Sequence, residues 1–420
     1  MKKIISTVAA LGLCCAMPAI AAAGNAPLLQ VLQNKGVLTP SEVAGIEAQG
    51  QKKSAALKGL TIELQSFIDY SAGEKAEPGN TSSSYNDFAV TRGYLTIKKK
   101  INPWLSGRIT TDIHRDSTAD ASTKGDYTVR LKYLYAELKP NDLGMLTSMK
   151  MEIGQGHNPW LDFEEHINPY RAQGPMAVER AHIFNSADVG ISLRGNIGGK
   201  LADAKALTGN SHYNGLYGSW HVGVYNGSGY HSNEVNGNKA IEGRLTIRPL
   251  PATLPGLQFS YLGMTGDGNK DYSPESNPDF SINLGMMSYE NPLFIFTAQY
   301  FQTTGNAGGS WTTGVNHKAL DTEGYSFFGR VRLPFVSEKL SVFGRYDHFD
   351  QDSDNVIADN TAYDLYIGGL SYDVAKGNQI LVDYENTNFD VNAGQKGKVP
   401  SLGNDLGDEH KIQVVYQLAF

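Results

Sequence analysis

The stretch that decides the fold is EHKIQVVYQLAF, residues 409–420. Apolar side chains occupy every second position and so share one face of an extended strand: Ile412, Val414, Tyr416, Leu418 and Phe420. The opposite face is mainly polar and carries Lys411, Gln413, Val415, Gln417 and Ala419. A period of two with these two faces predicts a β-strand that separates an apolar medium from water.

The same period recurs from Leu60 onward. In segment 127–136 the alternation predicts one face of Tyr127, Val129, Leu131, Tyr133 and Tyr135 and an opposite face of Thr128, Arg130 and Lys132. Segment 292–302 is apolar on both faces, so alternation does not fix its register. Marking each run predicts sixteen strands, near 60–71, 86–99, 103–115, 126–139, 147–156, 188–197, 216–226, 240–249, 256–264, 281–289, 292–302, 322–333, 339–350, 362–373, 378–388 and 409–420.

The predicted connections alternate in length, as they do in outer-membrane barrels. Short turns fall at 100–102, 290–291, 334–338 and 374–377. Long polar stretches fall at 72–85, 157–187, 265–280, 303–321 and 389–408. Segment 198–215 departs from this rule, because it is long for a connection at the short-turn end.

Composition favours the same fold class. The chain has 46 Gly and 22 Tyr, and only 19% of its residues are charged, which suits many strands with glycine-rich turns and aromatic belts. Beyond residue 23 no apolar run approaches the roughly 18 residues of a spanning helix. We therefore predict an all-β protein, a transmembrane antiparallel β-barrel of about sixteen strands. A secreted soluble β protein that binds glycans shares this composition, and such a protein would need no detergent for extraction.

The N-terminal region predicts export. Residues 1–23 combine Lys2 and Lys3, an apolar stretch and the small residues Ala21–Ala23, which is typical of a secretory signal peptide. Both cysteines, Cys14 and Cys15, lie in this segment, so no disulfide, thiol chemistry or haem attachment, and no cofactor, is expected. The formal net charge is −7, and about −9 without the two lysines, which argues against a nucleic-acid partner.

Residues 24–58 predict a periplasmic helical segment before the barrel of residues 59–420. Thr39, Pro40 and Glu42 stand at the cap, first-turn and capping-box positions of a helix. A flexible leader is the alternative, since Gln49–Ser54 is polar.

Two resemblances add to this interpretation. The strand that ends in Tyr416, Leu418 and Phe420 resembles the signal by which the barrel-assembly machinery recognises outer-membrane barrels, which implies the outer membrane of a Gram-negative bacterium. Four motifs resemble the third-loop region of the phosphate-selective porin O and P family, and LLQVLQNKGVLTPSEV (28–43) is similar to the helical leader of that family. The four motifs are GQGHNPW (154–160), EE (164–165), VER (178–180) and ADVGISLRG (187–195).

This resemblance implies a sixteen-stranded barrel, usually a homotrimer in outer-membrane lipid, whose third loop folds into the lumen. The arginine ladder and lysine cluster of the phosphate-specific members cannot be matched here position by position. The second half of the chain matches only as generic barrel strands.

Loop 157–187 is the predicted pore constriction, with aromatic anchors at Trp160, Phe163, Tyr170 and Phe184. Opposed charges across a narrow passage create a transverse field that sorts solutes by charge and dipole. The alternative is an exterior lid whose charges are solvated. The candidate constriction residues are Glu164, Glu165, Arg171, Glu179 and Arg180.

Basic side chains recur on the predicted lumen face, and fixed positive charge on a pore wall favours anions. They are Arg108, Arg130, Lys132, Arg194, Arg244, Arg248, Arg330, Arg332 and Arg345. The alternative is a neutral wall in which they pair with Glu63, Asp69, Asp112, Glu242 and Asp383.

The sequence thus predicts a porin for passive diffusion of small hydrophilic solutes or ions, with an anion or phosphate preference. We expect no enzyme and no metal site, because the chain has no HExxH or GxSxG motif, and we expect Asp350–Asn355 to be a solvated acidic tip. The rival hypothesis is a barrel that sheathes a partner, such as a periplasmic protein or a multihaem cytochrome of an electron conduit, and its lumen would be occupied.

Overall fold

The computed structural model describes residues 28–115, 125–272 and 276–420. The predicted signal peptide, residues 1–23, lies outside the described residues. The chain divides into two compact units, one up to Leu60 and one from Thr61 to Phe420. Among the described helices, none is both long and apolar enough to cross a bilayer.

The first unit is helical where it is described. A short helix covers residues 28–34, and α3 covers Pro40–Leu57. Thr39 and Glu42 form the predicted capping box: the Thr39 backbone N–H donates to Glu42 Oε2 over 2.8 Å, and the Glu42 N–H donates to Thr39 Oγ1 over 3.3 Å. The predicted helical leader is therefore confirmed.

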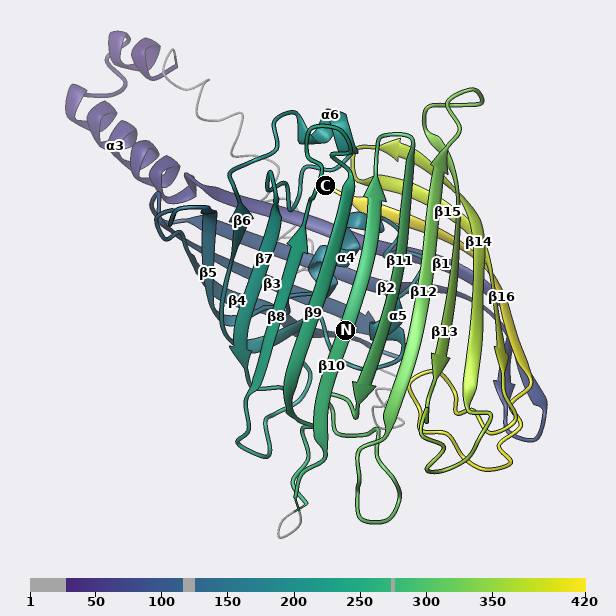
Figure 1. Cartoon of the computed structure of the whole chain (residues 1–420). Helices are drawn as coiled ribbons and strands as arrows, with labels where there is room; N and C mark the ends of the chain where they lie inside the picture. The colour runs from purple at the N-terminus through teal and green to yellow at the C-terminus, as the bar shows by residue number, and fades with distance from the viewer. Residues whose placement is uncertain (1–27, 116–124, 273–275) are drawn as a thin grey trace. The chain divides into compact units, whose positions relative to one another are not determined.

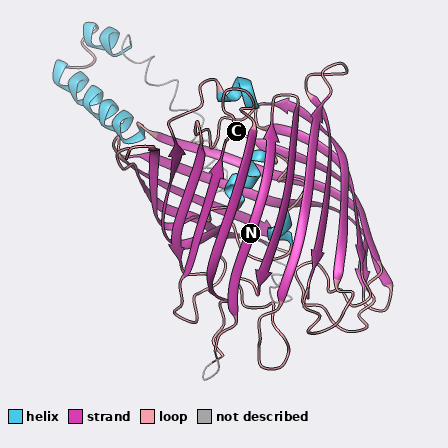
Figure 2. Ribbon diagram, in the orientation of Figure 1, coloured by secondary structure: helices cyan, strands magenta, loops and turns pink. Residues whose placement is uncertain are grey.

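The second unit is a closed antiparallel barrel of sixteen strands, as predicted (Figures 1 and 2). Each strand neighbours the next in sequence, and β1 closes the barrel against β16 with Gln65 opposite Ala419 and Glu74 opposite His410. The strands are β1 (Leu60–Glu77), β2 (Thr81–Lys100), β3 (Leu105–Arg115), β4 (Tyr127–Leu138), β5 (Leu146–His157), β6 (Ala187–Ile197), β7 (Gly218–Tyr225), β8 (Ala240–Ile247), β9 (Leu257–Asp267), β10 (Asp279–Glu290), β11 (Phe294–Thr304), β12 (Asp321–Arg332), β13 (Leu340–Asp350), β14 (Ala362–Ala375), β15 (Asn378–Phe389) and β16 (Asp408–Ala419).

Alternation along each strand sorts side chains between two environments. In β8, Ile241, Leu245 and Ile247 point outward and are at least 45% exposed, whereas Glu242, Arg244 and Thr246 point into the lumen and are almost fully buried. A continuous outer surface of exposed aliphatic and aromatic side chains is much larger than the apolar patches of soluble proteins, and it suits contact with lipid.

Connections at one end of the barrel, here called the loop end, include the long segments 158–186, 305–320 and 390–407, and the other end is the turn end. The predicted long connection at 72–85 is wrong, because β1 continues to Glu77 and β2 begins at Thr81. Alternation does not detect these strand ends, since their side chains are small or polar on both faces. Cross-strand bonds from Ser82 to Glu74 and from Ser83 to Glu77 stabilise the extension.

The predicted face assignment of β4 is wrong beyond Leu131. Thr111 pairs with Leu131 and Thr110 with Tyr133, so Lys132 has no partner in β3 and forms a β-bulge. The bulge reverses the alternation: Tyr133 and Tyr135 are buried in the lumen, whereas Tyr127 and Val129 stay on the outer face.

A hydrophobic core lies inside the barrel rather than between sheets. Loop 158–186 packs its apolar side chains against inward-facing residues of β9–β15, such as Leu262, Leu284 and Phe301. This explains why segment 292–302 is apolar on both faces: Ile295 and Phe301 face the loop, and Phe294 and Phe296 face outward.

Candidate functional site: a loop and a turn folded into the lumen

The connection between β5 and β6, residues 158–186, is called the inward loop. It contains two short helices, α4 (Leu161–Ile167) and α5 (Ala177–Arg180), which lie within the barrel (Figure 2). All four predicted aromatic anchors of this loop are at most 5% exposed: Trp160, Phe163, Tyr170 and Phe184. Burying a large apolar side chain stabilises by about 1.5–3 kcal/mol, so these anchors together hold the loop firmly inside.

Polar contacts fix the inward loop to one side of the lumen. The Tyr170 hydroxyl lies 2.6 Å from Ser371 Oγ of β14, and Gln173 Nε2 donates to Glu385 of β15 over 2.9 Å. Arg345 of β13 donates to the Pro175 carbonyl over 2.7 Å. At the other end of the loop, Arg244 of β8 donates to the Pro159 carbonyl over 2.9 Å. The loop is therefore bonded to wall strands from β8 to β15.

The connection between β6 and β7, residues 198–217, also folds inward and is called the inward turn. It carries α6 (Ala204–Thr208) and holds the end of α4. The Tyr213 hydroxyl donates to Asp162, Asn210 Nδ2 donates to the His166 carbonyl over 2.8 Å, and the rings of His166 and His212 are 3.8 Å apart. Sequence reasoning did not assign a role to this turn, although its excess length was the signal that could have found it.

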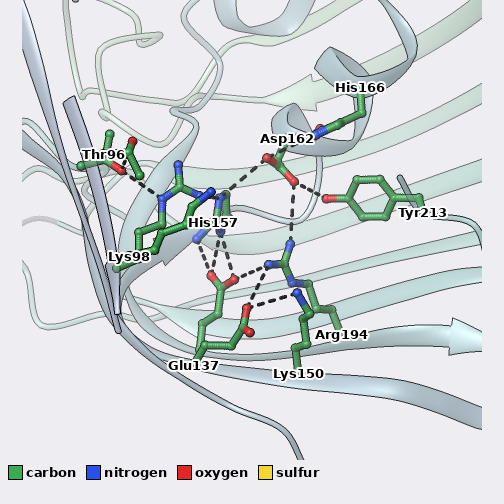
Figure 3. A network of polar contacts seen from close by, with 12 residues as sticks. Thr96, Lys98, Glu137, Lys150, His157, Asp162, His166, Arg194 and Tyr213 are labelled. Atoms are coloured by element: carbon green, nitrogen blue, oxygen red, sulfur yellow. Dashed lines mark hydrogen bonds and ion pairs between the residues drawn. The ribbon is translucent and has the colours of Figure 1, made fainter. Parts of the chain in front are cut away.

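An ion-pair network joins the inward loop to β4, β5 and β6 (Figure 3). Glu152 accepts from Arg194 Nη2 over 2.6 Å and from His157 Nδ1 over 2.9 Å. Arg194 also lies 3.7 Å from Asp162, and Lys150 lies 3.3 Å from Glu137. Burial raises the pKa of Asp162, but His157, His166 and Arg194 outweigh burial and hold this pKa well below its usual value. Asp162 is therefore an anion that fixes the loop.

The structure separates the predicted constriction residues into two places. Arg171 bridges Glu165 and Glu179, with Nε 2.9 Å from Glu165 Oε1 and Nη2 3.1 Å from Glu179 Oε1. Glu164 instead faces the wall, where Trp160 Nε1 and Gln299 Nε2 donate to it over 2.8 and 3.1 Å. Arg180 pairs with Glu385 of β15. The first three residues form a charged cluster, and Glu164 and Arg180 anchor the loop.

Burial also sets the charge of Glu164. The side chain is 7% exposed, and burial raises its pKa to about 7, a rise that Arg345 and the bonds from Trp160 and Gln299 only partly oppose. Glu164 is thus partly protonated at neutral pH.

The predicted lumen-facing cations are only partly neutralised. Among the described residues, carboxylates pair with four of them: Arg130 with Asp112, Arg194 with Glu152, Arg332 with Asp373 and Arg345 with Asp347. Within the same residues the others form no ion pair: Arg108, Lys132, Arg244, Arg248 and Arg330. Of the proposed acidic partners, Asp112 pairs as expected and Glu63 pairs with Lys98 instead.

The acidic segment at 350–355 is only partly the solvated tip that its sequence predicts, because Asp354 and Asn355 are exposed and Asp352 is not. Asp352 is fully buried, and its carboxylate accepts the backbone N–H groups of Val356, Ile357 and Ala358. It therefore organises its own loop. In the part of the chain that the structure describes, no group of three His, Cys, Asp or Glu side chains could hold a metal ion.

The predicted barrel-assembly signal lies at the end of the last strand. Tyr416 and Leu418 are on the outer side of β16 and pair with Ile68 and Ser66 of β1. The Phe420 side chain is exposed, and its backbone exchanges two hydrogen bonds with Leu64.

No protein-family model and no curated protein sequence matches this chain. Solved structures do match. An anion-selective porin from Comamonas acidovorans aligns with a TM-score of 0.56 at 12% identity, over 86% of this chain and all of that porin. Salmonella typhi OmpF in complex with daunomycin aligns with a TM-score of 0.57 at 13% identity, over 86% and 97% of the two chains. The trimer form of OmpT, an outer membrane protein of Vibrio cholerae, aligns with a TM-score of 0.50 at 11% identity, over 86% and 100%. This chain therefore has a porin-type fold.

Proposed function

We propose that this protein is an outer-membrane porin through which small hydrophilic solutes or ions diffuse, with a preference for anions. The observation that carries this proposal is a closed sixteen-stranded barrel whose inward loop is held against the wall from β8 to β15. The loop narrows the lumen, and we place the passage for solutes along β2–β4, opposite the wall from β8 to β15.

The proposed passage runs between a wall that carries positive charges and a loop that carries charges of both signs. On the wall, β2–β4 present Arg92, Arg108, Arg130 and Lys132. On the loop, Glu165 and Glu179 flank Arg171. Opposed charges of this kind produce a field across the passage, and the cations without carboxylate partners give it a net preference for anions.

The orientation follows from the connections. In outer-membrane barrels short turns face the periplasm and long loops face the exterior. We therefore place the turn end, with the inward turn, in the periplasm and the loop end outside. The segments 1–23 and 24–58 would then be an export signal and a periplasmic helical segment.

Three finer features belong to this proposal. The trimer form of the Vibrio cholerae protein supports a homotrimer in outer-membrane lipid, assembled by the barrel-assembly machinery. Phosphate preference rests on the resemblance to the phosphate-selective porins, and the cations on β3 and β4 would suit phosphate. The chain's own inward loop packs against the wall within the lumen, which argues against a barrel that sheathes a cytochrome.

The test is the single-channel conductance and reversal potential of the detergent-purified protein in a planar bilayer under a salt gradient. We expect discrete steps and an anion-directed potential. Arg171→Gln leaves Glu165 and Glu179 uncompensated, so the potential should shift toward cations. Lys239→Gln, at an exposed ion pair with Glu234, is the matched control and should leave it unchanged. Inserted protein that conducts nothing would contradict the proposal and favour a plugged or partner-filled barrel.

A further inference from the structure

Carboxylates collect at the loop end of the barrel (Figure 1). Each of the sixteen strands has one terminal residue at this end, and six of these residues are Asp or Glu whereas one, Arg115, is basic. None of the six is buried, so water reaches all of them. They are called the acidic rim and comprise Glu77, Asp267, Asp279, Asp321, Asp350 and Asp408.

The acidic rim is not neutralised by neighbouring cations. Among the described residues, none of its six carboxylates forms an ion pair with a lysine or an arginine. Asp267 and Asp279 lie directly opposite each other on β9 and β10. Like charges in this arrangement are destabilising. The sheet therefore gains no stability from this pair.

The connections at the loop end add negative charge. Apart from the inward loop, the described parts of these connections carry eight carboxylates and five lysines. Two of the five lysines are held by carboxylates, since Lys239 pairs with Glu234 and Lys396 pairs with Glu409. The loop end is thus net negative.

The turn end has the opposite charge. Its strand termini include one carboxylate, Glu290, and two basic residues, Lys100 and Arg332. Its connections carry three carboxylates and six basic residues. The six are Lys139, Lys200, Lys205, Arg248, Lys339 and Lys376. Charge is therefore separated along the axis of the barrel, with an acidic mouth at the loop end and a basic mouth at the turn end.

This separation makes the ion content of the two mouths different. A mouth that carries one sign of charge concentrates ions of the other sign, so the loop end gathers cations and the turn end gathers anions. A voltage that makes the loop side positive drives each ion in through the mouth that gathers it, and both ions accumulate in the passage. The reverse voltage drives cations toward the basic mouth and anions toward the acidic mouth, so the passage is depleted of both.

We infer that the barrel rectifies ionic current, and that it conducts better when the loop side is positive than when it is negative. The inference rests on the proposed function because it requires an open passage, but it does not depend on which ion the lumen prefers. It concerns the two mouths, whereas the proposed preference for anions concerns the lumen between them.

The test is the current–voltage curve of single channels of the detergent-purified protein in a planar bilayer, with the same KCl solution on both sides. The measured quantity is the ratio of the conductances at two voltages of equal size and opposite sign. We expect a ratio of about 2 in 0.1 M KCl, because oppositely charged mouths concentrate different ions. The ratio should be near 1 in 1 M KCl, where charges are screened within about 3 Å.

One-sided acid identifies the loop side. A buffer near pH 3 lies below the ordinary pKa of an aspartate, about 3.9, and removes most of the negative charge of the acidic rim when it is placed on the loop side. The ratio should then fall. The same side should be the one whose positive voltage gives the larger current.

Two triple variants test the source of the asymmetry. The first is Asp267→Asn, Asp279→Asn and Asp408→Asn, which removes half of the acidic rim with little change of shape. The second is the matched control and removes three carboxylates from the turn end: Asp142→Asn, Asp203→Asn and Glu338→Gln. We expect the first variant to lower the ratio toward 1 and the second to raise it.

Each outcome decides the inference. A wild-type ratio of 1 in 0.1 M KCl, a ratio that persists in 1 M KCl, an equal decrease in both triple variants, or a larger current when the acid-sensitive side is negative overturns it. In each of these cases the conducting barrel still supports the proposed function. Inserted protein that conducts nothing contradicts the proposed function and the inference together. Heat-modifiable migration on gels shows that each variant is folded.

Discussion

Arg180 of the inward loop and Glu385 of β15 form an ion pair, with 2.9 Å between Nη1 and Oε1, although 205 residues separate them along the chain. Both side chains are at most 9% exposed. Glu385 also lies 3.6 Å from Lys396 and 3.5 Å from Lys411, so it is the shared anion of three cations. The contact is a direct ion pair between α5 and the wall.

This asymmetry predicts that Glu385→Gln destabilises the barrel more than Arg180→Met does. Removing the shared anion takes away the carboxylate that pairs with Arg180 and Lys411, whereas Lys396 keeps Glu409, and breaking a buried pair costs about 3–5 kcal/mol. Removing Arg180 leaves Glu385 with two lysines, so we expect a cost of about 1–2 kcal/mol, near that of a charged hydrogen bond. The loss of stability of each variant is measured by urea unfolding, with gel mobility as the readout. Equal urea midpoints for the two variants would show that only the Arg180–Glu385 pair contributes and that the two lysines do not.

The pair of His166 and His212 predicts a loss of stability in acid. Burial, and then His166, lower the pKa of His212 to about 4, while Asp162 opposes this and Lys205 and Lys150 add to it. A histidine whose pKa is lower in the folded protein contributes stability that is present above its unfolded pKa near 6.5 and is lost as the pH falls through 4. We expect current fluctuations of the channel to increase between about pH 6.5 and 4, as the inward turn loosens.

His212→Gln removes this titration, and its fluctuations should depend less on pH over that range. His317→Gln is the control, because His317 stacks on Tyr272 in another part of the chain. A wild-type channel that is equally quiet at both pH values would mean that the contact between the inward turn and α4 survives protonation.

Glu164 predicts the opposite dependence on pH. Because burial raises its pKa to about 7, its contribution to stability is fully present below the unfolded pKa near 4.5 and is lost as the pH rises through 7. Glu164→Gln removes the charge: its amide oxygen can accept from Trp160, and its NH2 group can donate to Gln299 Oε1 once the Gln299 amide rotates. The variant should therefore gain stability relative to the wild type above pH 7, by a few kcal/mol at most, since one pKa unit corresponds to about 1.4 kcal/mol. Thermal midpoints between pH 5 and 9 test this, and parallel curves for the two proteins would contradict it.

The strand order and the inward loop could be predicted from sequence because both depend on local patterns. A period of two identifies a wall between two media, and four large aromatic residues in one polar connection identify a loop that must bury them. The face of Tyr133 could not be predicted, because a bulge inserts one extra residue into the strand and so shifts the alternation of its side chains. No residue type in this segment indicates where the bulge lies. The partners of Glu164 and Arg180 could not be predicted either, since Gln299 and Glu385 approach them only after barrel closure.

The barrel can be closed without the inward turn, so the role of the turn can be tested by shortening it. Lys200 and Gly215 are paired across the base of the turn, so residues 201–214 can be replaced by Asn-Gly, the preferred two-residue connection of an antiparallel hairpin. Strands β6 and β7 keep their register, with Ile197 opposite Gly218, and the barrel should fold. The end of α4 loses Tyr213, His212 and Asn210, so the inward loop gains freedom and single-channel conductance should rise and become noisier. Tyr213→Phe, which removes only the bond to Asp162, should show a smaller change in the same direction. A shortened protein with unchanged conductance and noise would show that wall contacts alone position the loop, and that the inward turn has no part in defining the passage.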